Sequence, residues 1–381
     1  MLTNGRLDTT RDEVSLYIHI PFCKKKCSYC HFYVIPDNSD KQLILFQALL
    51  KEWDTWRPHF SQKKLVSLYF GGGTPILLRT DLLSRLLEKI LGDVDYDQNI
   101  EITLEANPEE VTPEKCRELS AIGINRISIG IQSYDDNLLQ LLGRQHSGNK
   151  AVDALQIIAD AGIGNISADA MYDLPDQNFL HWERTLQKIV QSPVSHISLY
   201  NLTIEPQTLF YKQRKELTLR LPPEEESVRM YSFAREFLSS NGFQQYEISA
   251  FAKQGYQAIH NSGYWTGRPF IGLGPSAFSF WEGKRFQNIA HLGKYAEALE
   301  KGESPIDFQE QLPAENSLRE HIAVRLRLLD GFDLPCELPN SLKKDLSTVE
   351  KNGWVLKENN HIKLTDLGIL FYDSVATEII V

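Results

Sequence analysis

Three cysteines lie within eight residues, at Cys23, Cys27 and Cys30, directly after the apolar run 17–22. Thiols at the spacing C-x3-C-x2-C form a ligand set, and isolated buried thiols are the less favoured interpretation. A structural zinc ion takes four nitrogen or sulfur ligands, and no fourth cysteine or second CxxC pair lies nearby. A cubane iron-sulfur cluster has four irons, so three thiolates leave one iron open to an exchangeable ligand. The cysteines therefore favour a 4Fe-4S cluster that takes part in chemistry.

A glycine triplet is the second candidate binding element. The segment 71–75 reads Gly-Gly-Gly-Thr-Pro and follows a predicted strand. Glycine lets the backbone approach a ligand closely and exposes amide groups to an anion. Alone, the triplet is weak evidence, and it gains meaning only in combination with the cysteines.

Four polar side chains lie at or near the ends of further predicted strands: Glu105, Gln132, Arg144 and Asp169. A carboxylate and an amide at such positions bind ammonium and hydroxyl groups, and an arginine supplies a cation. Each of the charged residues alone is equally well explained as a surface ion-pair partner. Together they predict a polar rim.

The segment 260–265 reads His-Asn-Ser-Gly-Tyr-Trp and places one histidine among aromatic side chains. A histidine in such surroundings is usually packed and hydrogen-bonded. Imidazole is also an axial ligand of haem iron, and Tyr264 and Trp265 could stack on a flat apolar ring. Both interpretations of His260 stay open from these residues alone.

The hydrophobic pattern predicts the elements that position these residues. Between residue 15 and about residue 200, short apolar runs alternate with amphipathic stretches, which indicates repeated βα units around a parallel sheet. Strands are predicted at 15–20, 65–70, 101–105, 126–131, 165–171 and 196–200. Helices are predicted at 41–56, 81–91, 113–121, 137–142, 150–161 and 180–190. Six units predict an α/β fold, a partial (β/α)6 TIM-like barrel whose functional residues lie at the carboxyl ends of its strands.

The remainder of the chain predicts smaller units. After a helix at 224–240, shorter aromatic-rich runs predict an accessory β region at 243–247, 260–265 and 270–281. A helix at 292–301 leads to the polar stretch 302–311, which we interpret as a linker. The last part has winged-helix proportions, with helices at 314–329 and 341–352, a hairpin at 354–364 and a helix near 366–376. We therefore expect three domains, at 1–242, 243–303 and 304–381.

Composition limits the classes of function. The chain has 381 residues, 42% of them apolar and 24% charged, and a formal net charge of -10. Such an acidic balance argues against nucleic acid as the main partner, because binding phosphates needs clustered lysine and arginine. No run approaches the 18 apolar residues of a membrane span, and the first residues lack the apolar core of a signal peptide. We expect a cytoplasmic protein, in a reducing compartment that suits a cluster and leaves Cys116 and Cys336 as structural thiols.

The run 17–30, with Tyr29 just before the last cysteine, resembles the cluster loop of the radical S-adenosylmethionine (SAM) superfamily. Within it, the chain is similar to the branch that holds oxygen-independent coproporphyrinogen III oxidase and the haem chaperone HemW. The segment 71–75 resembles the part of the family that cradles the amino-acid end of SAM. The resemblance implies that the three cysteines hold the cluster and that SAM contacts Tyr17, Tyr29, Gly72, Gly73, Thr74, Glu105, Gln132, Arg144 and Asp169.

Two features favour the haem chaperone over the oxidase. The oxidase motif continues to a fourth cysteine two positions after the third, where this chain has Phe32. The HNxxYW segment is similar to a motif of the HemW branch whose histidine is implicated in haem binding. This implies His260 as an axial haem ligand, with Tyr264 and Trp265 lining the macrocycle.

The resemblance implies a protein that binds haem and passes it to an acceptor, with SAM as exchangeable ligand of the cluster. The alternatives are the oxidase, which decarboxylates coproporphyrinogen III, and a radical SAM enzyme that modifies RNA, which the acidic balance opposes. Expected partners are haem, an acceptor protein and a flavodoxin-type electron donor. A membrane-associated protein is one option for the acceptor. Whether SAM is cleaved stays open. The chain departs from the family pattern at His31, where relatives have aspartate, and at Asp173, where they have glycine, although aspartate tolerates the positive φ of a turn.

Overall fold

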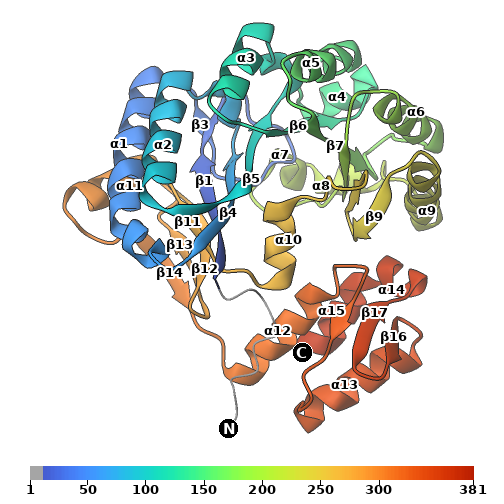
Figure 1. Ribbon diagram of the computed structural model, residues 1–381. Coiled ribbons are helices and arrows are strands. Elements are labelled where there is room, and N and C mark those ends of the chain that lie inside the picture. Colours follow the sequence, from blue (N-terminus) through green and yellow to red (C-terminus); the bar gives the residue numbers. More distant parts are fainter. Residues whose placement is uncertain (1–11) are drawn as a thin grey trace.

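The computed structural model describes residues 12–381 (Figure 1). Six parallel strands form the centre of a 12-stranded sheet with the order β14-β13-β12-β11-β1-β4-β5-β6-β7-β8-β10-β9. The six are β1 (Glu13–Ile20), β4 (Lys64–Gly72), β5 (Asp95–Ala106), β6 (Arg126–Gln132), β7 (Asn165–Tyr172) and β8 (His196–Asn201). The predicted partial barrel is confirmed, and each predicted strand lies within an observed one.

Helices cover the outside of these strands, as Figure 1 shows for α1 and α2. They are α1 (Ser39–Trp56), α2 (Thr80–Asp93), α3 (Pro113–Ala121), α4 (Asp136–Leu142), α5 (Gly148–Asp160) and α6 (Phe179–Val190). In α2 the buried residues follow helical spacing, at Leu82, Leu83, Leu86, Leu87 and Ile90, so one apolar face packs on the sheet. Apart from residues 95–99 of β5 and the end of β8, the strands are mostly buried because helices cover one face and side chains fill the other.

Further strands extend both edges of the same sheet. β9 (Gln244–Glu247) and β10 (Ala250–Ala252) follow β8, while β11 (Phe270–Leu273), β12 (Phe278–Trp281), β13 (Lys284–Asn288) and β14 (Ile306–Glu310) follow β1. Two predictions are wrong here. Residues 260–265 belong to a helix, α10 (Ile259–Thr266), because His260 and Tyr264 meet at the i, i+4 spacing of one helix face. The expected linker 302–311 contains β14, because its backbone pairs with β13.

Four more helices connect these parts: α7 (Leu209–Lys212), α8 (Arg214–Thr218), α9 (Glu224–Ser240) and α11 (Leu292–Glu300). The last part of the chain has its own apolar core and forms α12 (Ala314–Arg325), β15 (Phe332–Asp333), α13 (Asn340–Lys351), β16 (Val355–Glu358), β17 (His361–Leu364), α14 (Asp366–Leu370) and α15 (Tyr372–Ile380). We call residues 312–381 the C-terminal unit. The limits of the three expected domains stay a prediction.

The C-terminal unit packs beside α10 and the last strands of the sheet (Figure 1). Its attachment includes backbone hydrogen bonds, from the Ile248 amide to the Arg327 carbonyl oxygen at 3.2 Å and from the Leu329 amide to the Tyr246 carbonyl oxygen at 3.0 Å. Within residues 12–381, no helix has both the length and the apolar composition that crossing a membrane would require.

Candidate functional site

The loop with the three cysteines lies at the carboxyl end of the barrel strands. Cys23 ends a two-residue strand, β2 (Phe22–Cys23), which pairs in parallel with β3 (Ile35–Pro36). Two backbone bonds hold the loop to α4 and α7: the Ser28 amide donates to the Leu142 carbonyl oxygen at 3.0 Å, and the Phe210 amide donates to the Ser28 carbonyl oxygen at 3.0 Å. All three thiols are half-buried and free of disulfides. The loop therefore has a fixed shape that does not depend on a bond between its cysteines.

Two polar groups contact the thiols. The Thr74 hydroxyl lies 3.3 Å from the sulfur of Cys23, and Arg144 donates from Nη1 to the sulfur of Cys27 over 3.6 Å. Burial raises the pKa of Cys23 to about 11 and also raises the pKa of Cys30. A metal that takes these sulfurs must displace their protons, so binding by this loop releases protons.

The three sulfurs do not converge on one point. Within the described part of the chain, no three histidine, cysteine, aspartate or glutamate side chains are placed to hold a single metal ion. This arrangement disfavours a mononuclear zinc site. It agrees with a cluster, in which each thiolate binds a different iron, and three thiolates next to an arginine are a donor set that fits an anionic iron-sulfur cluster.

One residue that the sequence interpretation missed connects the two thiol partners. Asn107 donates from Nδ2 to the Thr74 hydroxyl at 3.1 Å and accepts from Arg144 Nη2 at 2.8 Å. Arg144 also donates to the carbonyl oxygen of Gly130. Gly143 ends α4 with a φ of 78°, and this turn starts the segment that carries Arg144 beneath the loop. The only sequence signal for Asn107 was its position two residues after Glu105.

The glycine segment differs from the expectation. The amides of Gly72, Gly73 and Thr74 all donate within the protein, to Glu105 Oε2 at 3.0 Å and to the carbonyl oxygens of Ile20 at 2.9 Å and Phe22 at 2.7 Å. The predicted set of free amides for an anion is therefore wrong, because these amides join β4 to β5 and to the segment before the cysteine loop. Gly72 has a φ of 109°, and a Cβ there would lie 2.5 Å from the His19 ring. Glycine is needed at this position for backbone shape and packing.

Glu105 lies where expected, near the end of β5. It accepts from the Tyr69 hydroxyl at 2.8 Å and from the Gly72 amide at 3.0 Å. Burial raises the pKa of Glu105 to about 7. Tyr17 stacks on Tyr69 with ring centroids 6.1 Å apart, and its hydroxyl lies 3.1 Å from His19 Nδ1. A half-buried carboxyl group with this pKa can accept from an ammonium or hydroxyl group that enters the rim.

Two polar atoms at this rim have no partner. Within residues 12–381, Gln132 Oε1 and Arg144 Nε are buried without a hydrogen bond, and both side chains lie against Gly130. A buried polar atom without a partner costs free energy, so such atoms indicate a missing ligand or water. Asp169 lies deeper, bonded to the Ser128 hydroxyl at 3.1 Å, and burial raises its pKa to about 6. The donor set and the unpartnered atoms together fit a cluster with a polar ligand beside it.

The remaining predicted SAM residue, Tyr29, packs on Phe210 with ring centroids 6.4 Å apart. The structure therefore places most of the predicted cluster and SAM residues at the carboxyl end of the barrel, with Asp169 deeper inside. His260 lies beneath this end, with its ring 4.8 Å from the Tyr69 ring and 6.5 Å from the Tyr17 ring.

His260 is buried in the amino half of the barrel interior. Its Nδ1 lies 3.0 Å from the Ser67 hydroxyl and its Nε2 lies 2.9 Å from the Tyr264 hydroxyl. Burial lowers its pKa to about 3. The amides of Ile259 and His260 both donate to the Glu101 carboxylate at 2.9 Å, which fixes the start of α10. In this arrangement neither ring nitrogen is free to bind iron.

Comparison with known proteins agrees with this geometry. The Radical SAM superfamily profile matches residues 17–189. The chain is 30% identical to a Lactococcus lactis protein called "Heme chaperone HemW" over 93% of this chain and 94% of the relative, and 33% identical to one of the same name from Haemophilus influenzae over 94% and 95%. The structure of coproporphyrinogen III oxidase (HemN) from Escherichia coli matches with a TM-score of 0.84 at 23% identity, over 98% of this chain and 91% of that chain, which shows the fold. The chain belongs to the radical SAM superfamily and, within it, to the family of proteins named HemW.

Proposed function

We propose that this protein binds haem and transfers it to an acceptor protein, and that it carries a 4Fe-4S cluster with SAM as the exchangeable ligand. The observation that carries the haem part is the match to HemW relatives over nearly the full length of both chains. Phe32 supports the same choice, because it stands where the oxidase motif has a fourth cysteine and its side chain is exposed.

In this proposal Cys23, Cys27 and Cys30 hold the cluster, and the rim binds SAM. Glu105 accepts hydrogen bonds from the ligand's polar groups, and the amide of Gln132 accepts or donates them. Arg144 keeps a positive charge beside the cluster. When bound and reduced, a cluster of this kind would supply the electron that splits SAM into methionine and a 5'-deoxyadenosyl radical. An electron donor of the flavodoxin type would be needed for that step. The protein's own part is to position the two groups at the half-buried rim next to the cysteine loop.

In this proposal His260 is the axial haem ligand, a role that requires some of its present hydrogen bonds to break. The bond from Nε2 to the Tyr264 hydroxyl must open, and α10 must turn or leave its place against Glu101. Tyr264→Phe should therefore increase the affinity for haem, because it frees Nε2 while keeping the ring. His260→Ala should lower the affinity and shift the Soret band without loss of the cluster absorption.

The experiment is anaerobic reconstitution of the full chain followed by titration with haem. The account expects a saturable Soret change near one haem per chain, and transfer of that haem to an apo-haemoprotein added afterwards. No haem binding by the wild type would overturn the proposed function. Haem binding that is unchanged in both His260→Ala and Tyr264→Phe would leave the function standing and remove His260 from it.

The oxidase is the alternative, because its structure shares this fold. The same reconstituted protein is therefore incubated with coproporphyrinogen III, SAM and a reductant. Conversion of the substrate together with the absence of bound haem would favour the oxidase. An RNA-modifying enzyme is the weaker alternative, since the net charge of -10 opposes nucleic acid binding.

A further inference from the structure

A cleft of about 480 Å³ separates the barrel from the C-terminal unit. The ends of β7 and β8, the first half of α9, and the segment from α14 to α15 form its walls. Tyr172, Asn201, Tyr231, Arg327, Phe371 and Asp373 are among its lining residues. The cleft does not include the cysteine loop, the predicted SAM residues or His260.

The walls of the cleft combine polar groups with apolar side chains that residues 12–381 leave partly exposed. Val228 is 43% exposed, Leu370 is 38% exposed and Phe371 is 46% exposed. The rings of Tyr172 and Tyr231 stack with centroids 6.1 Å apart beside them. Aromatic surface of this kind packs against the stem of a long side chain and attracts a cation at its tip.

The charges around the cleft are mostly negative. Asp373 lines it, and Glu224, Glu225 and Glu226 form the first turn of α9 just before the lining residues Ser227 and Val228. Arg229 pairs with Glu226 on this helix. Arg327 is the cation among the lining residues. Its Nη2 pairs with the buried Glu247 at 3.2 Å and its guanidinium lies over the ring of Trp265 at 4.3 Å, while its Nε has no hydrogen-bond partner among the described residues.

A buried carboxylate lies behind the wall. Asp173 is 8% exposed and follows the lining residue Tyr172. Its Oδ2 accepts from the side chain of Asn201, another lining residue, at 2.5 Å. The lining residue Ser227 also interacts with this carboxylate, while Oδ1 makes no hydrogen bond of regular geometry with the described residues. An unpartnered carboxylate oxygen at this depth is a strong acceptor for a donor that enters the cleft.

We propose that the cleft docks a segment of a partner protein that inserts a lysine or arginine side chain, with its charge directed toward Asp173 and its stem against the rings around Phe371. Charge complementarity decides between the occupants. A dicarboxylate such as a porphyrin would meet the carboxylates of Asp373 and Asp173, and the one lining arginine already shares its charge with Glu247. A basic, partly apolar segment meets opposite charge and apolar surface together. The proposal does not depend on haem as cargo.

The test uses the full chain and three fluorescent peptides of equal length, in which leucine alternates with lysine, glutamine or glutamate. Anisotropy titrations should rank the affinities as lysine above glutamine above glutamate. Asp173→Asn should lower the affinity for the lysine peptide about tenfold, to the level of the glutamine peptide, because it removes one charged hydrogen bond. Asparagine tolerates the φ of 59° at this position, and the melting temperature checks the fold. Asp173→Gly, which also suits this φ, is the second variant.

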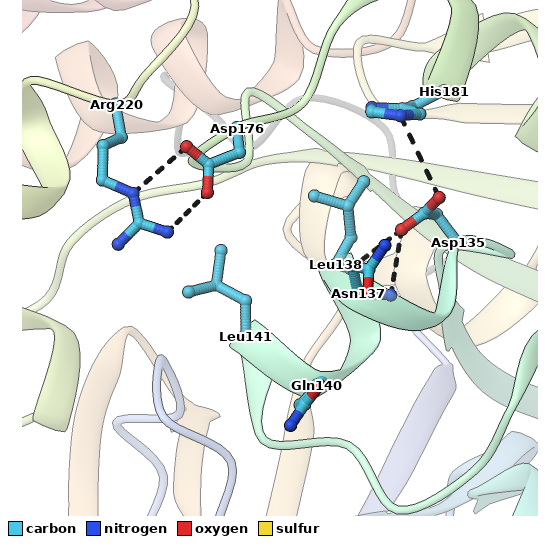
Figure 2. A pocket seen from close by; sticks show the side chains of 8 residues that line it. All are labelled: Asp135, Asn137, Leu138, Gln140, Leu141, Asp176, His181 and Arg220. Atoms are coloured by element: carbon cyan, nitrogen blue, oxygen red, sulfur yellow. Dashed lines mark hydrogen bonds and ion pairs between the residues drawn. The ribbon is translucent and has the colours of Figure 1, made fainter.

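Asp176→Asn is the matched control. Asp176 also has a positive φ, of 65°, and lies only three residues further along the chain. It lines a different hollow, where its carboxylate pairs with Arg220 at 2.5 Å (Figure 2). The control should leave the affinity for the lysine peptide unchanged.

Three results would overturn the proposal. One is equal binding, or no binding, of all three peptides. Another is an unchanged affinity for the lysine peptide in both Asp173 variants, or an equal loss in Asp173→Asn and Asp176→Asn. The last is a loss of haem affinity in Asp173→Asn with unchanged peptide binding, which would make the cleft a porphyrin site.

Discussion

The polar groups at the carboxyl end of the barrel and those around His260 differ in their hydrogen bonding. At the carboxyl end, Gln132 and Arg144 each keep a buried atom without a partner, and three thiols stand unbonded to one another. In the amino half, both nitrogens of His260 and both oxygens of Glu101 are hydrogen-bonded, although Nε and Nη1 of the buried Arg126 beside Glu101 have no hydrogen-bond partner among the described residues. Since an unpaired buried polar atom destabilises the folded chain, the unpaired atoms next to the cysteine loop are candidates for contact with a ligand.

This difference separates two kinds of candidate residue that look alike in a sequence. The rim leaves Gln132 Oε1 and Arg144 Nε open to a ligand, whereas both ring nitrogens of His260 are already used in hydrogen bonds within the fold. A ligand role for His260 thus needs a second arrangement of α10, and a ligand role for the rim needs none. The predictions below test this contrast between the rim and the His260 region.

The largest effect is expected at the thiols. Replacing Cys23, Cys27 and Cys30 together by alanine should remove all bound iron and acid-labile sulfide after reconstitution, because no other described residues offer a comparable donor set. Cys336→Ala is the control, since this exposed thiol lies in the C-terminal unit. Full cluster content in the triple variant would refute the assignment.

The next effect concerns stability. His260→Ala should lower the free energy of unfolding of the cofactor-free protein by about 3 kcal/mol, because it leaves the Ser67 and Tyr264 hydroxyls buried without a partner and opens a cavity. Gln132→Ala should change the same quantity by less than about 1 kcal/mol, since its Oε1 has no bond to lose. Urea unfolding measures both. Equal losses in the two variants would break the contrast.

The affinity for SAM should depend on the rim residue Glu105. Glu105→Gln should weaken SAM binding about tenfold, because one hydrogen bond to a charged group is lost at the rim. Glu114→Gln is the control, as this exposed carboxylate pairs with Arg117 on α3. Calorimetry on the anaerobic reconstituted protein gives the affinities. An unchanged affinity in Glu105→Gln would remove this carboxyl group from the pocket.

The smallest effect is a pH dependence. Burial raises the pKa of Glu105 from 4.5 to about 7, so the folded chain holds a proton that the unfolded chain has already lost. Its contribution to stability is therefore present below pH 4.5 and is lost as the pH rises to about 7. Glu105→Gln should remove this part of the decline in the free energy of unfolding. We expect a difference of about 1 kcal/mol, because solvent partly screens a half-buried group. Unfolding curves across this range compare the two proteins, and parallel curves would contradict the shift.

Much of the fold could be predicted, because its elements carry strong periodic patterns. The helix at 224–240 and the strand at 126–131 match the structure within one residue. The prediction failed at 260–265, where aromatic side chains at helical spacing resemble a short strand. It also failed at 302–311, since the polar edge strand β14 is recognised only through its partner β13.

The site could be predicted in part, but not from periodic patterns. Residue types and spacing indicated the thiols and the strand-end residues, and the left-handed turn at Asp173 was expected and is confirmed by a φ of 59°. Spacing does not reveal which hydrogen bonds are already made. The amides of the glycine segment were expected to be free but are used within the protein, and the bridging role of Asn107 depends on two loops that meet only in the folded chain.

The most direct measurement of the central claim is electron paramagnetic resonance of the reconstituted, reduced protein with and without SAM. Because three cysteines leave one iron of the cluster open at the rim, the account predicts a 4Fe-4S signal whose g values change when SAM is added. Glu105→Gln should need more SAM for the same change. A cluster signal that saturating SAM leaves unaltered in the wild type would contradict the account.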